Sequence, residues 1–182
     1  MGGWTDGYRC SVTRIDPPWA GPERATLLGF LQYHRDTLAL KCEGLTDEQL
    51  AERSVPPSSM SLIGLVRHLT DVERSWFRRV AMAESDDTAG PIHFVRGTND
   101  DGEFDDASAA TVAADLATWR NEMAVVDGII AGLHDLDRTC HRDGWDDDMS
   151  IRWILVHMIE EYARHNGHAD FLRERIDGAT GE

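Results

Sequence analysis

Apolar residues recur every three or four positions along four long stretches of the chain, a spacing that places them on one side of an α-helix. The first stretch covers about residues 21–41 and the second about residues 61–80. The third covers about residues 108–133, and the fourth runs from residue 150 to about residue 175. Little of the sequence alternates with the two-residue period of a β-strand. The pattern therefore predicts an all-α fold, a four-helix bundle with long connections.

Capping residues refine the ends of these helices. Thr46 is followed three residues later by Gln49, the spacing of a capping box, which predicts a short helix between the first two long ones. Gly178 fits the end of the last helix, because glycine adopts the left-handed conformation of a helix terminus without strain. The serines expected to cap the later long helices are Ser59 or Ser61, Ser108 and Ser150.

Two connections differ from the rest of the chain in composition. Residues 84–106 are rich in Asp, Gly, Thr and Asn around the segment IHFVRG, which predicts a surface excursion with one short strand, placed to cover a pocket as a lid. The Asp-rich residues 143–148 predict a solvated acidic loop. Large side chains at helical spacing are expected to fill the core: Trp76, Trp119, Met123 and Trp153.

Length and charge narrow the class of protein. The 182 residues fit a single domain over residues 1–182, with a helical core at about 22–178 and an N-terminal extension over residues 1–20. The formal net charge of −15, without a basic cluster, argues against nucleic acid and anionic membranes as partners. We find no long apolar run and no signal-peptide pattern, so we expect a soluble, cytoplasmic protein. The three cysteines fit a reducing compartment, and none is an obvious nucleophile.

Several common catalytic motifs are absent from the sequence, namely GxGxxG, the P-loop, GxSxG and HExxH. Nucleotide binding, serine hydrolysis and zincin-type proteolysis therefore lose support. Helix bundles build metal and ligand sites from side chains on facing helices, so polar residues on the inner sides of the helices are the main clue.

The last long helix carries such polar residues beside its apolar side. Glu161, His165 and His168 fall within roughly 60° of one another on an ideal helix. Glu161 and His165 have the i, i+4 spacing that lets two ligands hold one metal ion, and a catalytic zinc site needs a third ligand from elsewhere. His68, at the edge of the apolar side of the second long helix, is the best candidate. A second possible ligand set, His157, Glu161 and His165, would come from the last helix alone. We rank it lower, because side chains on three successive turns converge poorly on one ion.

Structural roles stay open for the same residues. An unpaired carboxylate on an apolar side of a helix is costly to bury. A metal ion or an arginine such as Arg35 would offset this cost for Glu161 equally well. A single histidine at a helix edge, as His68 is, more often has a structural role than binds a metal. His168 is expected to support the ligands or contact the substrate. His34 either reaches the pocket or, more simply, packs between helices.

Two segments, SLIGLVRHLTDVERSWF and EEYARHNGHADFLRERIDG, closely resemble the DinB-like superfamily in its actinobacterial mycothiol-transferase branch, over most of residues 22–180. The resemblance implies a four-helix bundle whose pocket holds a divalent metal ion, bound by one ligand from the second long helix and two from the last. By position these ligands correspond to His68, Glu161 and His165. Many relatives have histidine in place of Glu161, and the glutamate resembles the arrangement of mycothiol-dependent maleylpyruvate isomerase. Zn²⁺ is the expected metal, and Ni²⁺ is also compatible.

The resemblance also implies a function. It indicates a metal-dependent S-transferase that conjugates the thiolate of mycothiol, a low-molecular-weight thiol, to electrophilic small molecules for detoxification or biosynthesis. No catalytic residue beyond the metal site is implied, and we place His34 and His168 as candidates for binding the thiol cosubstrate. A homodimer is expected from the family alone. The alternatives are a mycothiol-dependent isomerase of the maleylpyruvate type and a non-catalytic metal-binding or stress-response protein.

Overall fold

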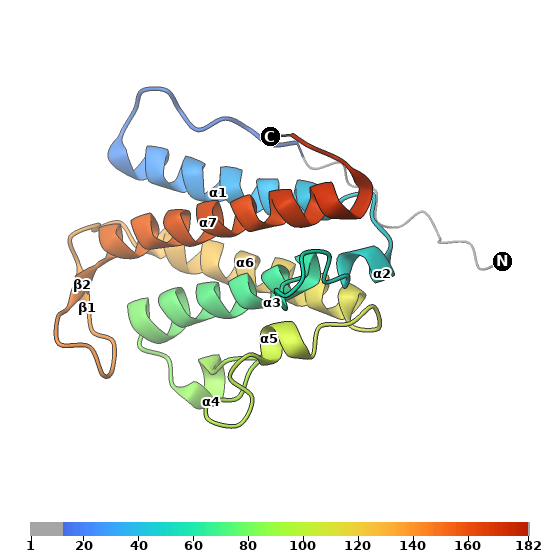
Figure 1. Ribbon diagram of the computed structural model, residues 1–182. Coiled ribbons are helices and arrows are strands. Elements are labelled where there is room, and N and C mark those ends of the chain that lie inside the picture. Colours follow the sequence, from blue (N-terminus) through green and yellow to red (C-terminus); the bar gives the residue numbers. More distant parts are fainter. Residues whose placement is uncertain (1–12, 182) are drawn as a thin grey trace.

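The computed structural model describes residues 13–181, and its long helices lie side by side (Figure 1). Of the predicted N-terminal extension, residues 1–12 lie outside the described residues, as does Cys10. The long helical segments are α1 (Glu23–Cys42), α3 (Leu62–Glu73) with its π-helical continuation η1 (Arg74–Ala81), α6 (Val112–Gly132) and α7 (Ile151–Asp177). The short elements are α2 (Asp47–Leu50), α4 (Asp86–Ala89), α5 (Gly102–Asp105), β1 (Thr139–Cys140) and β2 (Met149–Ser150).

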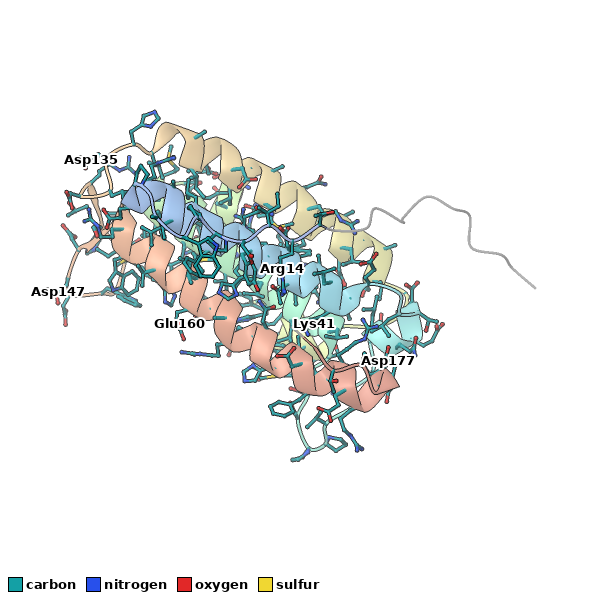
Figure 2. All side chains as sticks on the ribbon, turned by 90° about the horizontal axis from the view of Figure 1, so that it is seen from above. Arg14, Lys41, Asp135, Asp147, Glu160 and Asp177 are labelled. Atoms are coloured by element: carbon teal, nitrogen blue, oxygen red, sulfur yellow. The ribbon has the colours of Figure 1, made fainter. Side chains whose placement is uncertain are left out.

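The last long helix, α7, packs against two of the other long helices. α7 contacts both α1 and α3, while α3 also contacts α6. Figures 1 and 2 show α1 and α7 running alongside each other over most of their lengths. The predicted all-α fold is therefore confirmed, with only one two-stranded sheet in residues 13–181. None of the helices in this part of the chain is long and apolar enough to cross a membrane.

Most of the predicted helix ends are confirmed, because they depend on contacts between near neighbours in sequence. The capping box of Thr46 and Gln49 is present at the start of α2. Ser61 accepts a hydrogen bond from the backbone of Gly64 at 3.1 Å, and Ser150 accepts one from Trp153 at 3.2 Å. α7 ends at Gly178, which has a left-handed φ of 77°.

The cap predicted at Ser108 is wrong. α6 begins only at Val112, with Thr111 as the residue before it. The carbonyl of Ser108 accepts hydrogen bonds from the backbone and the hydroxyl of Thr111, which closes a separate turn ahead of the helix. The residues around Ser108 thus form a local turn in place of the predicted helix cap.

The excursion over residues 84–106 contains α4 and α5 instead of the predicted strand. A single isolated bridge pairs Val95 with Asn99, within the segment expected to be extended. Asp71 of α3 fixes this excursion by accepting hydrogen bonds from the backbone of Ile92 at 2.7 Å and of His93 at 2.9 Å. A buried carboxylate thus takes up the backbone donors of the connection, which is held against α3.

Arg67 fixes the second half of the same excursion. Its guanidinium is buried and donates to the carbonyls of Gly102 at 3.0 Å and Glu103 at 2.9 Å. The same guanidinium forms an ion pair with Asp115 of α6 at 3.3 Å. α5 is therefore held at a defined position beside α3.

The buried aromatic side chains agree largely with expectation. Trp119 and Tyr162 are among the largest fully buried residues, and Trp76 is also buried. Met123 is partly buried against the core. Trp153 differs: it is 40% exposed, because it stacks on His157 at the surface of α7. The acidic residues 143, 146, 147 and 148 are exposed as predicted, and Figure 2 shows Asp147 in the loop at one end of the bundle.

Candidate metal centre

α3 and α7 bring His68, Glu161 and His165 together. The Oε2 atom of Glu161 lies 3.5 Å from Nε2 of His165 and 4.0 Å from Nε2 of His68. The rings of the two histidines are 4.6 Å apart between their centroids. One ligand atom from each of the three residues lies within 4.8 Å of the others. The two helices therefore gather the three predicted ligands into one cluster, which we call the ligand cluster.

The electrostatics of the ligand cluster are those of a site that attracts positive charge. Burial alone would lower the pKa of His68, but the carboxylates of Glu103 and Glu161 outweigh it and raise the pKa to about 9. The neighbouring imidazoles of His165 and His68 hold the pKa of Glu161 well below its usual range. Two imidazole nitrogens and a carboxylate oxygen also form a common donor set for catalytic zinc. The residues present therefore fit a divalent cation.

Glu103 of α5 orients His68 from the side opposite Glu161. The Nδ1 atom of His68 lies 3.3 Å from Oε1 of Glu103. Burial would raise the pKa of Glu103, but the hydrogen bond with His68 and the nearby charge of Arg67 lower it. An ionised carboxylate only accepts hydrogen bonds, so Nδ1 of His68 is the donor and Nε2 points toward Glu161. This is the usual way in which a second carboxylate fixes a metal-binding histidine.

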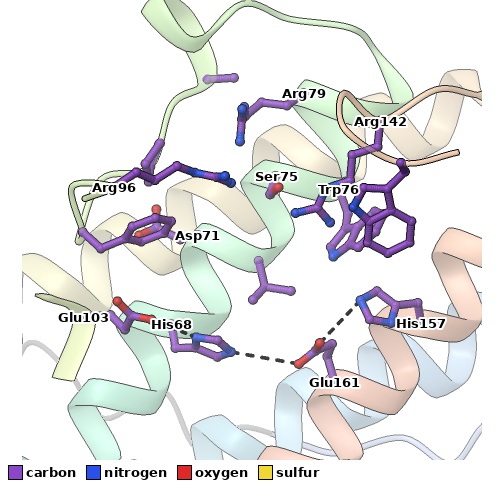
Figure 3. Close-up of a pocket in the computed structure, with 15 residues that line it drawn as sticks. His68, Asp71, Ser75, Trp76, Arg79, Arg96, Glu103, Arg142, His157 and Glu161 are labelled. Atoms are coloured by element: carbon purple, nitrogen blue, oxygen red, sulfur yellow. Dashed lines mark hydrogen bonds and ion pairs between the residues drawn. The ribbon is translucent and has the colours of Figure 1, made fainter. Parts of the chain in front are cut away.

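A cavity of about 370 Å³ opens beside the ligand cluster (Figure 3). His68, Glu103 and Glu161 line one end of it. Aromatic side chains line it further along, among them Trp76 and Trp145. The ligand cluster is therefore reachable by a small molecule, which a purely structural ion pair does not require.

A comparison with known protein families identifies the family of this chain. A family model described as mycothiol-S-transferase matches residues 26–178. The chain belongs to the mycothiol S-transferase family. The resemblance seen in the sequence is thereby confirmed, and the match includes every residue of the ligand cluster. No curated protein sequence matches the chain significantly.

Within this mycothiol S-transferase family member, Arg35 is not the partner of Glu161. Arg35 donates to both carboxylate oxygens of Glu73, at 2.8 Å and 2.5 Å, and to Asp127 at 2.7 Å. The ion pair with Glu161 considered from the sequence is therefore wrong. Every ion-pair partner of Glu161 in residues 13–181 is a histidine, the third being His157.

His157 lies on the other side of Glu161 from the ligand cluster. Its Nε2 atom is 3.4 Å from Oε1 of Glu161, whereas His68 and His165 approach Oε2. With Glu160 it forms a second group of potential ligands that shares Glu161. His157 and His165 thus do not meet in one cluster, which agrees with the low rank given to a set drawn from α7 alone.

Neither of the two histidines predicted to bind the thiol is among the residues that line the cavity. His34 contacts Asn166, whose side-chain amide donates to the His34 carbonyl at 3.0 Å, and burial lowers the pKa of His34. The Nδ1 atoms of His168 and His165 are 3.3 Å apart, so His168 touches the ligand cluster from behind. Their role in binding the thiol stays a prediction.

Sequence reasoning missed Glu103 and the cavity residues of the acidic loop. No local pattern marks Glu103, because its partner His68 lies on a distant helix. A weaker signal was available for the loop over residues 141–148, where Arg142 and Trp145 interrupt a run of aspartates. This arginine and tryptophan are the local features that could have drawn attention to the loop.

Proposed function

We propose that this protein is a metal-dependent S-transferase that joins mycothiol to small electrophiles. The observation that carries the proposal is the position of His68, Glu161 and His165 at one end of a cavity, in a chain of the mycothiol S-transferase family. These three side chains would hold a divalent ion, for which we propose Zn²⁺, with Ni²⁺ as the other candidate. When bound with an open position, such an ion supplies the chemistry that keeps a thiol ionised near neutral pH.

The protein's own residues set the conditions for this reaction. Glu161 contributes a negative charge and two lone-pair oxygens, and Glu103 fixes the orientation of His68. The aromatic walls of Trp76 and Trp145 exclude water from part of the cavity and offer an apolar surface to the electrophile. A charged nucleophile reacts faster when fewer water molecules surround it.

The nucleophile is assigned to the thiol cosubstrate and not to a protein cysteine. Cys42 is buried, and burial raises the pKa of its thiol to about 12. Neither Cys42 nor Cys140 lines the cavity. During transfer the thiol loses its proton to solvent and its sulfur forms a bond to carbon. In a displacement the leaving group departs with the electron pair of its bond; in an addition the neighbouring carbon takes up a proton.

For the biological setting we propose a role in detoxifying electrophiles, in a cytoplasmic homodimer, as the sequence resemblance implies. Sedimentation equilibrium of the purified protein tests the dimer, and a mass of 20.4 kDa per particle would contradict it.

Elemental analysis and thiol consumption test the reaction together. We expect near-stoichiometric zinc in the wild type and loss of mycothiol in step with 1-chloro-2,4-dinitrobenzene. His68→Ala, Glu161→Ala and His165→Ala should lose both properties, while His134→Ala, at an exposed histidine, should keep both. A wild type that takes up no metal after zinc addition would overturn the proposal. If candidate electrophiles rearranged while the thiol was recovered, the reaction would be isomerisation instead.

A further inference from the structure

Three arginines line the end of the cavity that lies across from the ligand cluster. Arg79 comes from η1, Arg96 from the connection between α4 and α5, and Arg142 from the loop between β1 and β2. Figure 3 shows their side chains grouped on the far side of the cavity from His68 and Glu161. Segments distant in sequence therefore place three guanidinium groups around one space.

Two of these charges have no carboxylate partner in residues 13–181. Arg79 forms an ion pair with the exposed Asp86 at 2.6 Å. Arg96 has no hydrogen bond or ion pair within the same residues, and the Arg142 guanidinium lies over Trp76 and Trp145, at 4.4 Å and 5.0 Å from the ring centroids. Burial lowers the pKa of Arg142, and the neighbouring charges of Arg96 and Arg79 lower it further. Within residues 13–181, Asp86 offsets the charge of Arg79 and two tryptophan rings face that of Arg142, but neither Arg96 nor Arg142 has a carboxylate partner.

The acidic residues that line the cavity are already engaged elsewhere. Asp71 accepts the backbone hydrogen bonds of the excursion, while Glu103 and Glu161 face His68. None of the three forms an ion pair with Arg96 or Arg142. The cavity therefore has one end that attracts a cation and another that attracts an anion.

In this chain, an ion pair is the commonest arrangement for the arginines of residues 13–181, although Arg14, Arg24 and Arg138 donate to a hydroxyl or to backbone carbonyls instead. The chain's 33 acidic residues outnumber its 18 basic ones, so a carboxylate partner is easily found on the surface. Most other arginines have such partners, among them Arg35, Arg67, Arg74, Arg78, Arg152 and Arg173. Guanidinium groups held in a partly dry cavity bind carboxylate and related oxyanions through charge-assisted hydrogen bonds.

We propose that the electrophile carries an oxyanion group, a carboxylate in the simplest case, which binds Arg96 and Arg142. The apolar body of the electrophile then lies against Trp76 and Trp145, and its reactive carbon faces the ligand cluster. This inference rests on the proposed transferase function and adds the class of substrate to it. The arginines act on binding and orientation, so they are expected to discriminate between anionic and neutral electrophiles of the same shape.

A matched pair of electrophiles tests the charge preference. With 4-chloro-3-nitrobenzoate and 4-chloro-3-nitrobenzamide, the thiol sulfur forms a bond to the ring carbon, chloride leaves, and the thiol proton goes to solvent. Enzymatic rates are divided by the uncatalysed rate for each compound. We expect Arg96→Gln and Arg142→Gln to raise KM for the benzoate roughly tenfold to hundredfold, because each removes a charge-assisted hydrogen bond. KM for the benzamide should change much less than KM for the benzoate, and the metal content should stay unchanged.

Two further variants separate charge at the cavity from other effects. Arg175→Gln makes the same change of charge at an exposed position near the end of α7 and should leave both substrates unaffected. Arg96→Lys keeps the charge and should retain part of the preference for the benzoate. An equal rise in KM for both electrophiles, or no preference in the wild type, would overturn the proposal.

Tryptophan fluorescence gives a readout that does not depend on catalysis, since Trp76 and Trp145 line the cavity. Saturable binding of unreactive benzoate, absent for benzamide and lost in Arg96→Gln, supports the anion site even if no thiol transfer occurs; the transferase function alone would then fail. Equal binding of benzoate and benzamide in an active transferase overturns the anion site and leaves the function standing.

Discussion

Two of the polar clusters between the helices of residues 13–181 differ in how their charges are balanced. In the first, Arg35 binds both oxygens of Glu73, and Tyr162 donates to Glu73 at 2.6 Å. Trp119 donates in turn to the Tyr162 hydroxyl at 3.0 Å. We call these four residues the closed cluster. The side chains of Arg35 and Glu73 are only 2% and 0% exposed, so this cluster is sealed from solvent.

The ligand cluster has the opposite character. Glu161 faces histidines only, and both Glu161 and His68 line a cavity. A guanidinium cannot lose its proton in a protein, so the closed cluster is neutralised permanently. An imidazole can exchange its proton for a metal ion, so the ligand cluster can be loaded and emptied. A buried charge is therefore not enough to indicate a binding site. Side chains that can exchange a proton for a metal ion, and that lie beside a cavity, do indicate one.

The largest expected effect comes from breaking the closed cluster. Arg35→Ala should lower the free energy of unfolding by roughly 3–5 kcal/mol, because the buried Glu73 loses the positive charge that balances it. Urea denaturation of the metal-free protein measures it. The double variant Arg35→Met/Glu73→Leu removes both charges and should recover most of the loss. If Glu161→Gln cost as much stability as Arg35→Ala, the two clusters would not differ as described.

A metal ion should stabilise the ligand cluster only. Zinc at 100 times its dissociation constant should stabilise the wild type by about 2.7 kcal/mol, because it binds the folded state. The gain should vanish in Glu161→Gln and survive in His134→Ala, as measured by thermal unfolding with and without a chelator. Equal stabilisation of Glu161→Gln by zinc would place the bound ion elsewhere.

Removing the carboxylate behind His68 should have an intermediate effect. Glu103→Ala should weaken metal affinity roughly tenfold to hundredfold, because His68 loses the group that fixes its orientation. Competition with a chelator of known affinity measures the change. Glu160→Ala, at a carboxylate near His157, is the matched control and should leave the affinity unaltered. A larger loss in the control would favour the second group of ligands.

Truncating His157 should change metal binding very little. Its Nε2 atom approaches the oxygen of Glu161 that faces away from His68 and His165. His157→Ala should therefore keep near-stoichiometric zinc, whereas His165→Ala should not. Elemental analysis of the two proteins side by side gives the answer, and the reverse result would move the site to the surface of α7.

The smallest effect is expected at Cys42, a buried free cysteine. With its pKa raised to about 12, its thiolate fraction at pH 8 is on the order of one in ten thousand, and it rises only as the pH approaches that value. Iodoacetamide should leave Cys42 unlabelled in the folded protein and label it in urea, as read by mass spectrometry. Rapid labelling in the folded state would reopen the case for a protein nucleophile.

Features that depend on near neighbours along the chain could be predicted from the amino-acid sequence. The apolar periodicity located the long helices, and Ser61, Ser150 and Gly178 marked where helices begin or end. Glu161 and His165 share a side of α7 because a helix repeats every 3.6 residues. The ligand set with His68 came from the resemblance to a family, since spacing alone did not single out that histidine.

The pairing of charges that are distant in sequence could not be predicted and is seen only in the folded chain. Arg35 binds Glu73 and not Glu161, and Glu103 reaches His68 because Arg67 holds α5 against α3. Arg96 and Arg142 converge on one cavity from two connections, of which the sequence predicted the first as a lid over a pocket and the second as a solvated loop, without indicating that they meet. The physical reason is the distance along the chain over which each interaction acts. Local backbone geometry fixes which residues share a side of a helix, whereas the partner of a charge depends on the register in which helices and loops pack.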